Sequence, residues 1–124
     1  MRIGELARRT GVSERSLRYY EQQGLLESGR TPGGHREYAE RAVDRVVRIQ
    51  IMYAAGLSSR TIADMLPCMH DDGGPNEATT ETLAAELRIE RERIDGQIAD
   101  LLRTREILDE VIEAAQLPSQ GASA

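Results

Sequence analysis

Arginine and aromatic side chains are concentrated in two short stretches within the first third of the chain. In the first stretch, Ser13–Gln22, helical spacing places Arg15, Arg18 and Tyr19 on one side. Guanidinium groups bind phosphates and guanine edges through paired hydrogen bonds, and tyrosine hydroxyls also bind phosphate oxygens. We therefore expect this stretch to contact DNA, with Arg15 reading a base while Arg18 and Tyr19 bind phosphates.

The second stretch surrounds Pro32-Gly33-Gly34 and is expected to form a β-hairpin, because Gly-Gly tolerates the positive φ of tight turns. Its basic and aromatic side chains are predicted to lie along the adjacent DNA backbone or minor groove. The candidate DNA-binding residues of the two stretches are Ser13, Arg15, Ser16, Arg18, Tyr19, Arg30, His35, Arg36 and Tyr38.

Two short helices joined by a glycine-containing turn are expected to position these residues. Ile3, Leu6 and Ala7 have the spacing of the inner edge of one helix, Thr10-Gly11-Val12 supplies the turn, and Ser13 caps the second helix. Such a pair is the helix-turn-helix unit, whose second helix enters the major groove. The side chains expected to point inward from the turn and the second helix are Val12, Leu17 and Tyr20. With the hairpin, the pattern predicts a mainly α fold that begins with a winged helix-turn-helix domain.

Residues 39–67 are expected to complete this DNA-binding domain, which we place at residues 1–67. Apolar side chains occur at near-helical spacing in residues 39–55, and Gly56 ends that run. Ser58 is suited to cap a shorter helix that Pro67 stops. The apolar residues of the longer helix are Val43, Val46, Val47, Ile49 and Tyr53. Apolar stripes of this kind indicate core helices without chemistry of their own.

The second half of the chain predicts a linker, a long helix and a tail. Residues 68–81 are polar and glycine-rich, whereas residues 82–117 contain no proline and have apolar side chains every seven residues. About four heptads of this pattern predict a coiled coil with a second chain, although Arg91 and Arg105 interrupt one core row. The expected dimer interface consists of Leu87, Ile94, Ile98, Leu101, Leu108 and Ile112. Residues 118–124 are expected to be disordered.

The net charge of −5 is the sum of two halves of opposite sign. Residues 1–60 hold 11 Arg against 7 acidic residues, a net +4, and residues 61–124 hold 5 Arg against 14, a net −9. Because affinity for nucleic acid depends on the local field, the basic half can bind DNA. The sequence has neither a membrane-spanning apolar run nor a signal peptide, so we expect a cytoplasmic protein without a membrane partner.

The motifs of the first half occur in a characteristic order: Ile3-Gly4-Glu5-Leu6-Ala7, Thr10-Gly11-Val12-Ser13, Leu17-Arg18-Tyr19-Tyr20-Glu21, Gly24-Leu25-Leu26, Gly33-Gly34-His35-Arg36-Glu37-Tyr38 and Gly56-Leu57-Ser58. In this order they resemble the MerR family of bacterial transcription regulators, as a short member without a large effector domain. Arg2 departs from the family pattern, in which a capping Thr or Ser is common, and Ala54 stands where a basic residue is frequent.

The resemblance implies a sequence-specific regulator that acts as a homodimer through an antiparallel coiled coil. Such dimers distort double-stranded promoter DNA, and RNA polymerase is an indirect partner at the promoter. The alternative is an architectural, excisionase-like protein that bends DNA without responding to an effector. An adaptor that uses only its coiled coil is a third class, and DNA binding distinguishes it from the other two.

Catalysis and metal binding receive little support from the sequence. Cys68 and His70 have no third orienting group, and neither a Ser/His/Asp set nor a phosphate-binding glycine loop is found, so we expect no enzyme activity. Cys68 and His70, with Asp71 or Asp72, are the candidate metal ligands. Related metal and redox sensors use two or more cysteines, however, so we expect neither a metal site nor a cofactor.

Overall fold

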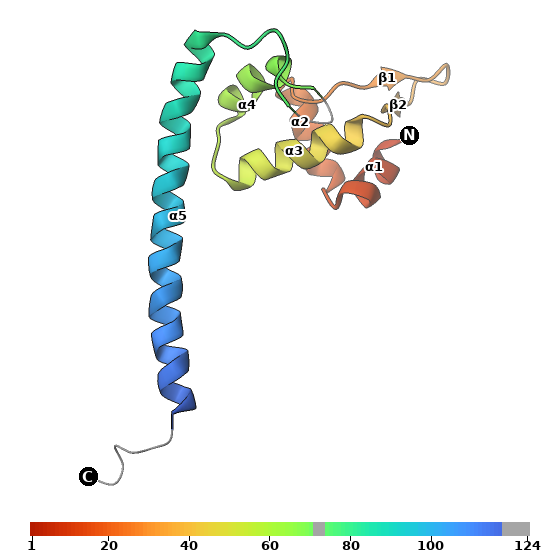
Figure 1. Ribbon diagram of the computed structural model, residues 1–124. Helices are drawn as coiled ribbons and strands as arrows, with labels where there is room; N and C mark the ends of the chain where they lie inside the picture. Colours follow the sequence, from red (N-terminus) through yellow and green to blue (C-terminus); the bar gives the residue numbers. More distant parts are fainter. Residues whose placement is uncertain (71–73, 118–124) are drawn as a thin grey trace, which may run out of the picture. The chain divides into compact units, whose positions relative to one another are not determined.

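The computed structural model describes residues 1–70 and 74–117, and it divides into two compact units after Glu86. Helices dominate both units, and the two strands form one antiparallel pair (Figure 1). The elements are α1 (Ile3–Thr10), α2 (Glu14–Gln22), β1 (Gly29–Arg30), β2 (Arg36–Glu37), α3 (Ala42–Ala54), α4 (Ser59–Met65), the 3-10 turn η1 (Leu66–Cys68) and α5 (Glu81–Gln116). The predicted helix-turn-helix and wing are therefore both present.

Local capping residues fix where the short helices begin and end. The Ser13 hydroxyl accepts a hydrogen bond from the Ser16 amide at 3.1 Å, and Ser58 caps α4 in the same way. Gly11 ends α1 with a φ of 74°, a left-handed conformation that glycine adopts without steric cost. Arg2 makes no side-chain cap on α1, in agreement with its departure from the family pattern.

The core of the first unit lies where α1 packs against α2 and α3, and where α3 packs against α4. Val12, Leu17 and Tyr20 are buried, which confirms the inward face predicted for the second helix. The buried apolar residues are Leu6, Val12, Leu17, Tyr20, Leu25, Leu26, Tyr38, Ala42, Val46, Ile49, Met52, Leu57, Ile62 and Leu66. Burial of this apolar surface is the main stabilising contribution to the unit.

One face of α3 differs from its predicted role as core. Val47 is 39% exposed and Ile51 is 63% exposed, whereas Val46 and Ile49 are fully buried. The two exposed side chains line an open hollow of about 450 Å³, together with Met65 and other residues. The helix therefore has a buried apolar face and a second apolar face that is exposed among the described residues.

The segment after α4 is held by local hydrogen bonds. The α-helix ends at Met65, two residues before the predicted stop at Pro67. Helical structure then continues through Pro67 as the 3-10 turn η1. The Asn76 side chain donates to the Pro67 carbonyl at 2.9 Å, and the Asn76 amide donates to the Cys68 carbonyl at 2.9 Å. These contacts bring Asn76 next to the end of η1, while Asp71 and Asp72 lie outside the described residues.

The long helix α5 matches the helix predicted from the heptad pattern to within one residue at each end. None of its side chains is buried, and Leu101, Leu108 and Ile112 are 68%, 56% and 53% exposed. Ion pairs between residues three apart, such as Arg93–Glu90 at 2.9 Å, lie along it. No helix in the described part of the chain is long and apolar enough to cross a membrane. The tail predicted to be disordered, residues 118–124, lies outside the described residues.

Candidate nucleic-acid interface

Helix α2 has one buried side and one exposed side, as its sequence predicts. Leu17 and Tyr20 anchor it in the core with 0% and 6% exposure. Arg15, Arg18 and Tyr19 lie on the exposed side, while Ser16 is half-buried beside the Ser13 cap. The helix therefore presents two guanidinium groups and a phenol to the surroundings from a backbone that is fixed at its first turn.

Tyr19 also connects α2 to the start of α4. Its hydroxyl lies 3.4 Å from the Ser59 hydroxyl, which also hydrogen-bonds to Tyr53. The Tyr53 ring stacks on Tyr20, with ring centroids 5.5 Å apart. Burial raises the pKa of Tyr20, and the nearby Tyr53 raises it further, so Tyr20 stays neutral. Sequence reasoning missed this cluster because Tyr19 and Ser59 are separated by 40 residues.

The wing is a short hairpin with a hydrogen-bonded tip. The Thr31 amide donates to the His35 carbonyl at 2.8 Å, and the Gly34 amide donates to the Thr31 carbonyl at 2.9 Å. Arg30 and Arg36 are directly opposite each other across the two strands, and both are exposed, as is His35. Like charges in this position destabilise a hairpin. The pair therefore concentrates positive charge on the wing, where Arg30 also donates to the Gly34 carbonyl at 3.1 Å and Arg36 lies beside the Glu21 carboxylate.

Tyr38 is a correction to the predicted set of DNA-binding residues. Its side chain is 2% exposed, and its hydroxyl donates to a carboxylate oxygen of Glu21 on α2. A side chain buried in this way cannot lie along DNA. The burial and the hydrogen bond to Glu21 both raise the pKa of Tyr38, so the phenol remains a donor.

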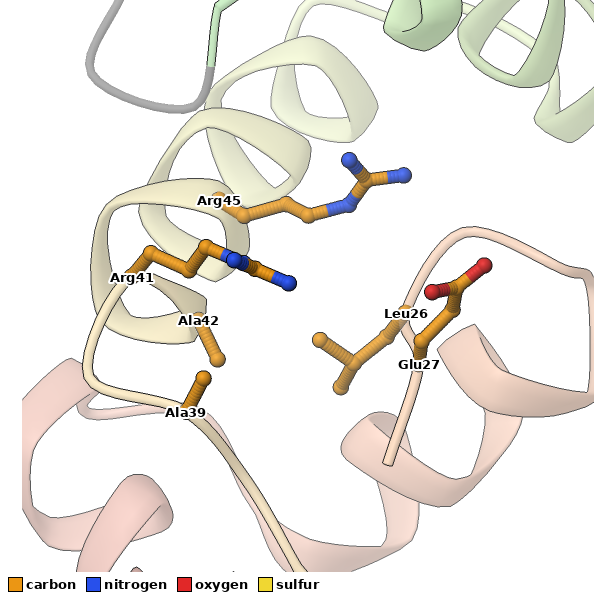
Figure 2. Close-up of a pocket in the computed structure, with 6 residues that line it drawn as sticks. All are labelled: Leu26, Glu27, Ala39, Arg41, Ala42 and Arg45. Carbon is orange, nitrogen blue, oxygen red and sulfur yellow. The ribbon is translucent and has the colours of Figure 1, made fainter. Parts of the chain in front are cut away.

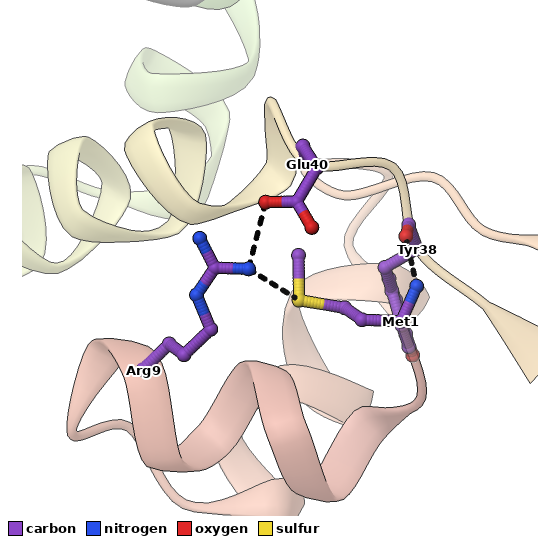
Figure 3. Close-up of polar contacts among 4 residues, drawn as sticks. All are labelled: Met1, Arg9, Tyr38 and Glu40. Atoms are coloured by element: carbon purple, nitrogen blue, oxygen red, sulfur yellow. Dashed lines mark hydrogen bonds and ion pairs between the residues drawn. The ribbon is translucent and has the colours of Figure 1, made fainter.

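The backbone of Tyr38 is paired with the start of the chain. Its carbonyl accepts a hydrogen bond from the Met1 ammonium at 2.7 Å, and its amide donates to the Met1 carbonyl at 2.7 Å (Figure 3). Beside this pair, Arg9 forms an ion pair with Glu40 at 2.7 Å. Tyr38 therefore fixes the base of the wing to both α1 and α2, a structural role that its position beside the wing residues did not reveal.

A small hollow lies between the segment that follows α2 and the start of α3. Its volume is about 150 Å³, and Arg41 and Arg45 extend toward the Leu26–Glu27 segment across it (Figure 2). The Nε of Arg45 donates to the Leu25 carbonyl at 2.8 Å. This contact gives Arg45 a role in holding the segment that connects α2 to the wing.

The candidate metal ligands are not gathered by the described part of the structure. Cys68 is half-buried, and its thiol donates to the carbonyl of Ala78 at 3.5 Å. His70 is exposed. Among the described residues, no cluster of three or more histidine, cysteine or acidic side chains is placed to hold a metal ion. Asp71 and Asp72, the other proposed ligands, are outside those residues.

We expect Cys68→Ser to fold and bind DNA like the parent protein, because a serine hydroxyl can also donate to the Ala78 carbonyl. We also expect the purified parent to contain less than about one zinc per dimer, since a preformed structural site normally retains its metal. Elemental analysis combined with a thiol titration measures both. Stoichiometric metal that disappears in Cys68→Ser would contradict this expectation and indicate a metal-sensing site.

Comparison with known proteins shows which family this chain belongs to. The sequence model described as MerR HTH family regulatory protein matches residues 1–67, which hold the helix-turn-helix, the wing, α3 and α4. The chain belongs to the MerR family. The match ends just before Cys68, so the family assignment rests on the DNA-binding unit.

Two curated MerR-family relatives extend the similarity into α5. The nodulation protein NolA of Bradyrhizobium elkanii is 42% identical over 107 residues, which cover 84% of this chain but 44% of NolA. The chain thus spans less than half the length of that relative. The mercuric resistance operon regulatory protein of Bacillus cereus is 34% identical over 113 residues, covering 90% of this chain and 83% of that protein.

A solved structure shows the same MerR-family fold. HiNmlR, described as a MerR family regulator lacking the sensor domain and bound to promoter DNA, superposes with a TM-score of 0.70 at 24% identity. The alignment covers 93% of this chain and 89% of HiNmlR. The arrangement of a winged helix-turn-helix followed by a long helix is therefore shared with a protein of similar length.

Proposed function

We propose that the protein is a homodimeric, sequence-specific transcription regulator of the MerR type that distorts promoter DNA. The observation that carries the proposal is the exposure of Arg15 and Arg18 on α2, next in the fold to a wing that carries Arg30 and Arg36. HiNmlR is described as bound to promoter DNA. The match of residues 1–67 to the MerR family supports the same role here.

In this proposal α2 enters the major groove and the wing follows the adjacent backbone. Arg15 reads a base edge, Ser13 and Ser16 lie at the helix start that faces the groove, and Arg18 and Tyr19 bind phosphate. Arg30, His35 and Arg36 of the wing supply further phosphate or minor-groove contacts. Tyr38, a buried residue, is no longer part of the proposed contact set.

The exposed apolar stripe of α5 is the proposed dimer interface. Ile98, Leu101, Leu108 and Ile112 are at least half exposed, and an isolated amphipathic helix has no other place to bury such a stripe. We propose that two copies pair antiparallel and so hold two α2 helices for the two halves of a palindrome. Leu87 and Ile94, which are half-buried, extend the same stripe toward the N-terminus of α5.

Promoter activity follows from deforming the DNA between the half-sites. Bending or untwisting DNA costs energy, and the protein must recover it through contacts that only the distorted DNA allows. The distortion changes the spacing between the two promoter elements, so that RNA polymerase can engage both. An architectural, excisionase-like role is not favoured. The curated relatives are regulatory proteins, and a long helix suited to dimerisation fits binding to a palindrome.

Selection of duplexes from a randomised pool tests the proposal with three variants. Arg18→Ala and Arg36→Ala are expected to weaken binding to all sequences and to lower its salt dependence, because phosphate contacts release counterions. Arg15→Ala is expected to relax preference at one position in each half-site, by about 1–3 kcal/mol.

Arg103→Ala on α5 is the matched control, since it removes a guanidinium that is 66% exposed and outside the proposed interface with DNA. It is expected to leave both the selected sequence and the salt dependence unchanged. An Arg15→Ala protein that selects the same sequence as the parent would refute the assignment of the base-reading residue. A parent protein that selects no sequence would refute the proposed function.

A further inference from the structure

Glu21 is an acidic residue on the helix that is proposed to contact DNA, and both of its carboxylate oxygens are directed to the wing side of the fold. One oxygen accepts the hydrogen bond from the buried Tyr38 hydroxyl, and the other lies 3.4 Å from Nε of Arg36. The carboxylate therefore joins the last turn of α2 to strand β2 and to the residue that follows it.

The hydrogen bond to Glu21 satisfies the buried Tyr38 hydroxyl, but stability is a weak explanation for the ion pair with Arg36. The Arg36 side chain is 41% exposed, and ion pairs with an exposed partner contribute little to folding because water screens them. The Glu21 side chain is 16% exposed and carries a negative charge on the element that approaches phosphates, where it repels them. This repulsion would be offset if the same carboxylate improved DNA binding in another way.

The partners of Glu21 suggest what that effect is. The hydroxyl of Tyr38 holds the carboxylate from a side chain that is fixed by burial and by the backbone pairing with Met1. The second carboxylate oxygen forms an ion pair with Arg36, whose Nε lies 3.4 Å away. The ion pair thus places the Arg36 guanidinium beside the last turn of α2 in the free protein.

We propose that Glu21 is a positioning residue, which orients Arg36 of the wing relative to α2 and thereby raises the preference for specific over non-specific DNA. The inference rests on the proposed function. A guanidinium that is already oriented loses less conformational freedom on binding, and this advantage is largest where the wing and α2 must meet fixed positions on one operator. Non-specific DNA gains less from it, because its contacts are not tied to one geometry.

Glu21→Gln tests this role while the amide oxygen can still accept from Tyr38. The measured quantity is the ratio of affinities for the duplex selected by the parent protein and for a scrambled duplex of the same length. We expect the ratio to fall about fivefold, the factor associated with ordering one long side chain at an interface. Affinity for the scrambled duplex is expected to hold or rise, since one negative charge is removed.

Glu37→Gln is the matched control, because it removes the same charge from an exposed residue next to Arg36 in β2. It is expected to tighten binding to both duplexes equally and to leave the ratio unchanged. Arg36→Ala is itself expected to lower the ratio, because specific DNA gains most from the oriented guanidinium. In that background Glu21→Gln is expected to lower the ratio no further, since the side chain that it positions is gone.

Three outcomes would overturn the proposal. A ratio that is unchanged in Glu21→Gln would show that Glu21 affects DNA binding only through its charge or through the fraction of protein that is folded. Thermal unfolding of the same samples measures that folded fraction. An equal fall in the Arg36→Ala background would show that Glu21 acts through another group. A parent protein that selects no duplex would refute the proposed function and this inference with it.

Tyr38→Phe provides a second test of the proposal if Glu21→Gln fails to fold. It leaves the charge of Glu21 in place but removes the hydroxyl that holds the carboxylate. The ratio is expected to fall in the same direction, and an unchanged ratio in a folded Tyr38→Phe protein would overturn the proposal.

Discussion

Replacement of Leu101 and Leu108 together by glutamate is expected to make the protein monomeric and to weaken its binding to a palindromic operator about 100- to 10,000-fold. The two leucines are 68% and 56% exposed in the single chain, on the stripe that repeats every seven residues. In a coiled coil they would be buried, and carboxylates in that place cannot be desolvated without a large cost. Without the pairing, each half-site binds separately and the gain from linking two sites is lost.

The same helix offers a matched control. Ile89 and Ile107 are 69% and 60% exposed, but the heptad pattern places them on the outer side of α5. Ile89→Glu with Ile107→Glu makes the same chemical change and adds the same charge, so we expect it to leave both dimerisation and operator binding intact. Light scattering gives the mass of each variant and titration gives its affinity. Equal loss of dimer in both variants would contradict the predicted dimer interface.

Local signals made the helix-turn-helix predictable from sequence. The caps Ser13 and Ser58 act on amides three residues away, and Gly11 ends α1 through its own backbone conformation. Such interactions are encoded within a few residues, so a single sequence shows them directly. The period of the apolar residues in α5 is local in the same sense, and it placed both ends of that helix to within one residue.

Long-range contacts explain what the sequence did not reveal. Tyr38 follows Arg36 in a stretch of exposed wing residues, and its burial depends on Glu21, 17 residues earlier, and on Met1, 37 residues earlier. Tyrosine is equally suited to binding phosphate and to filling a core with its hydroxyl paired. Residue type therefore left both roles open, and only the tertiary structure distinguishes them.

The second face of α3 is a related case. Val46 and Val47 are adjacent and chemically identical, yet they are 0% and 39% exposed. An apolar side chain at helical spacing predicts that a surface will be covered, but it does not predict whether the same chain covers it. The exposed apolar residues of α3 and of α5 are both of this kind. For both helices the sequence predicts an apolar stripe but does not predict which surface packs against it.

Ile49→Ala is expected to lower the free energy of unfolding by about 2–5 kcal/mol. Ile49 is fully buried in α3, the helix that packs against both α1 and α4, so removal of its side chain leaves a cavity that the surrounding core fills only in part. Because small domains are stabilised by only about 5–15 kcal/mol, this loss is a large share of the total.

Ile51→Ala is the control, two residues along the same helix and 63% exposed. The same substitution there is expected to change the unfolding free energy by less than about 0.5 kcal/mol. Urea titrations at one fixed protein concentration compare the two, since the stability of a dimer depends on concentration. Ile49→Ala should reduce DNA binding only through its folded fraction and leave the preferred sequence unchanged, because its fully buried side chain cannot contact DNA. Equal destabilisation by both substitutions would contradict the division of α3 into a core face and an open face.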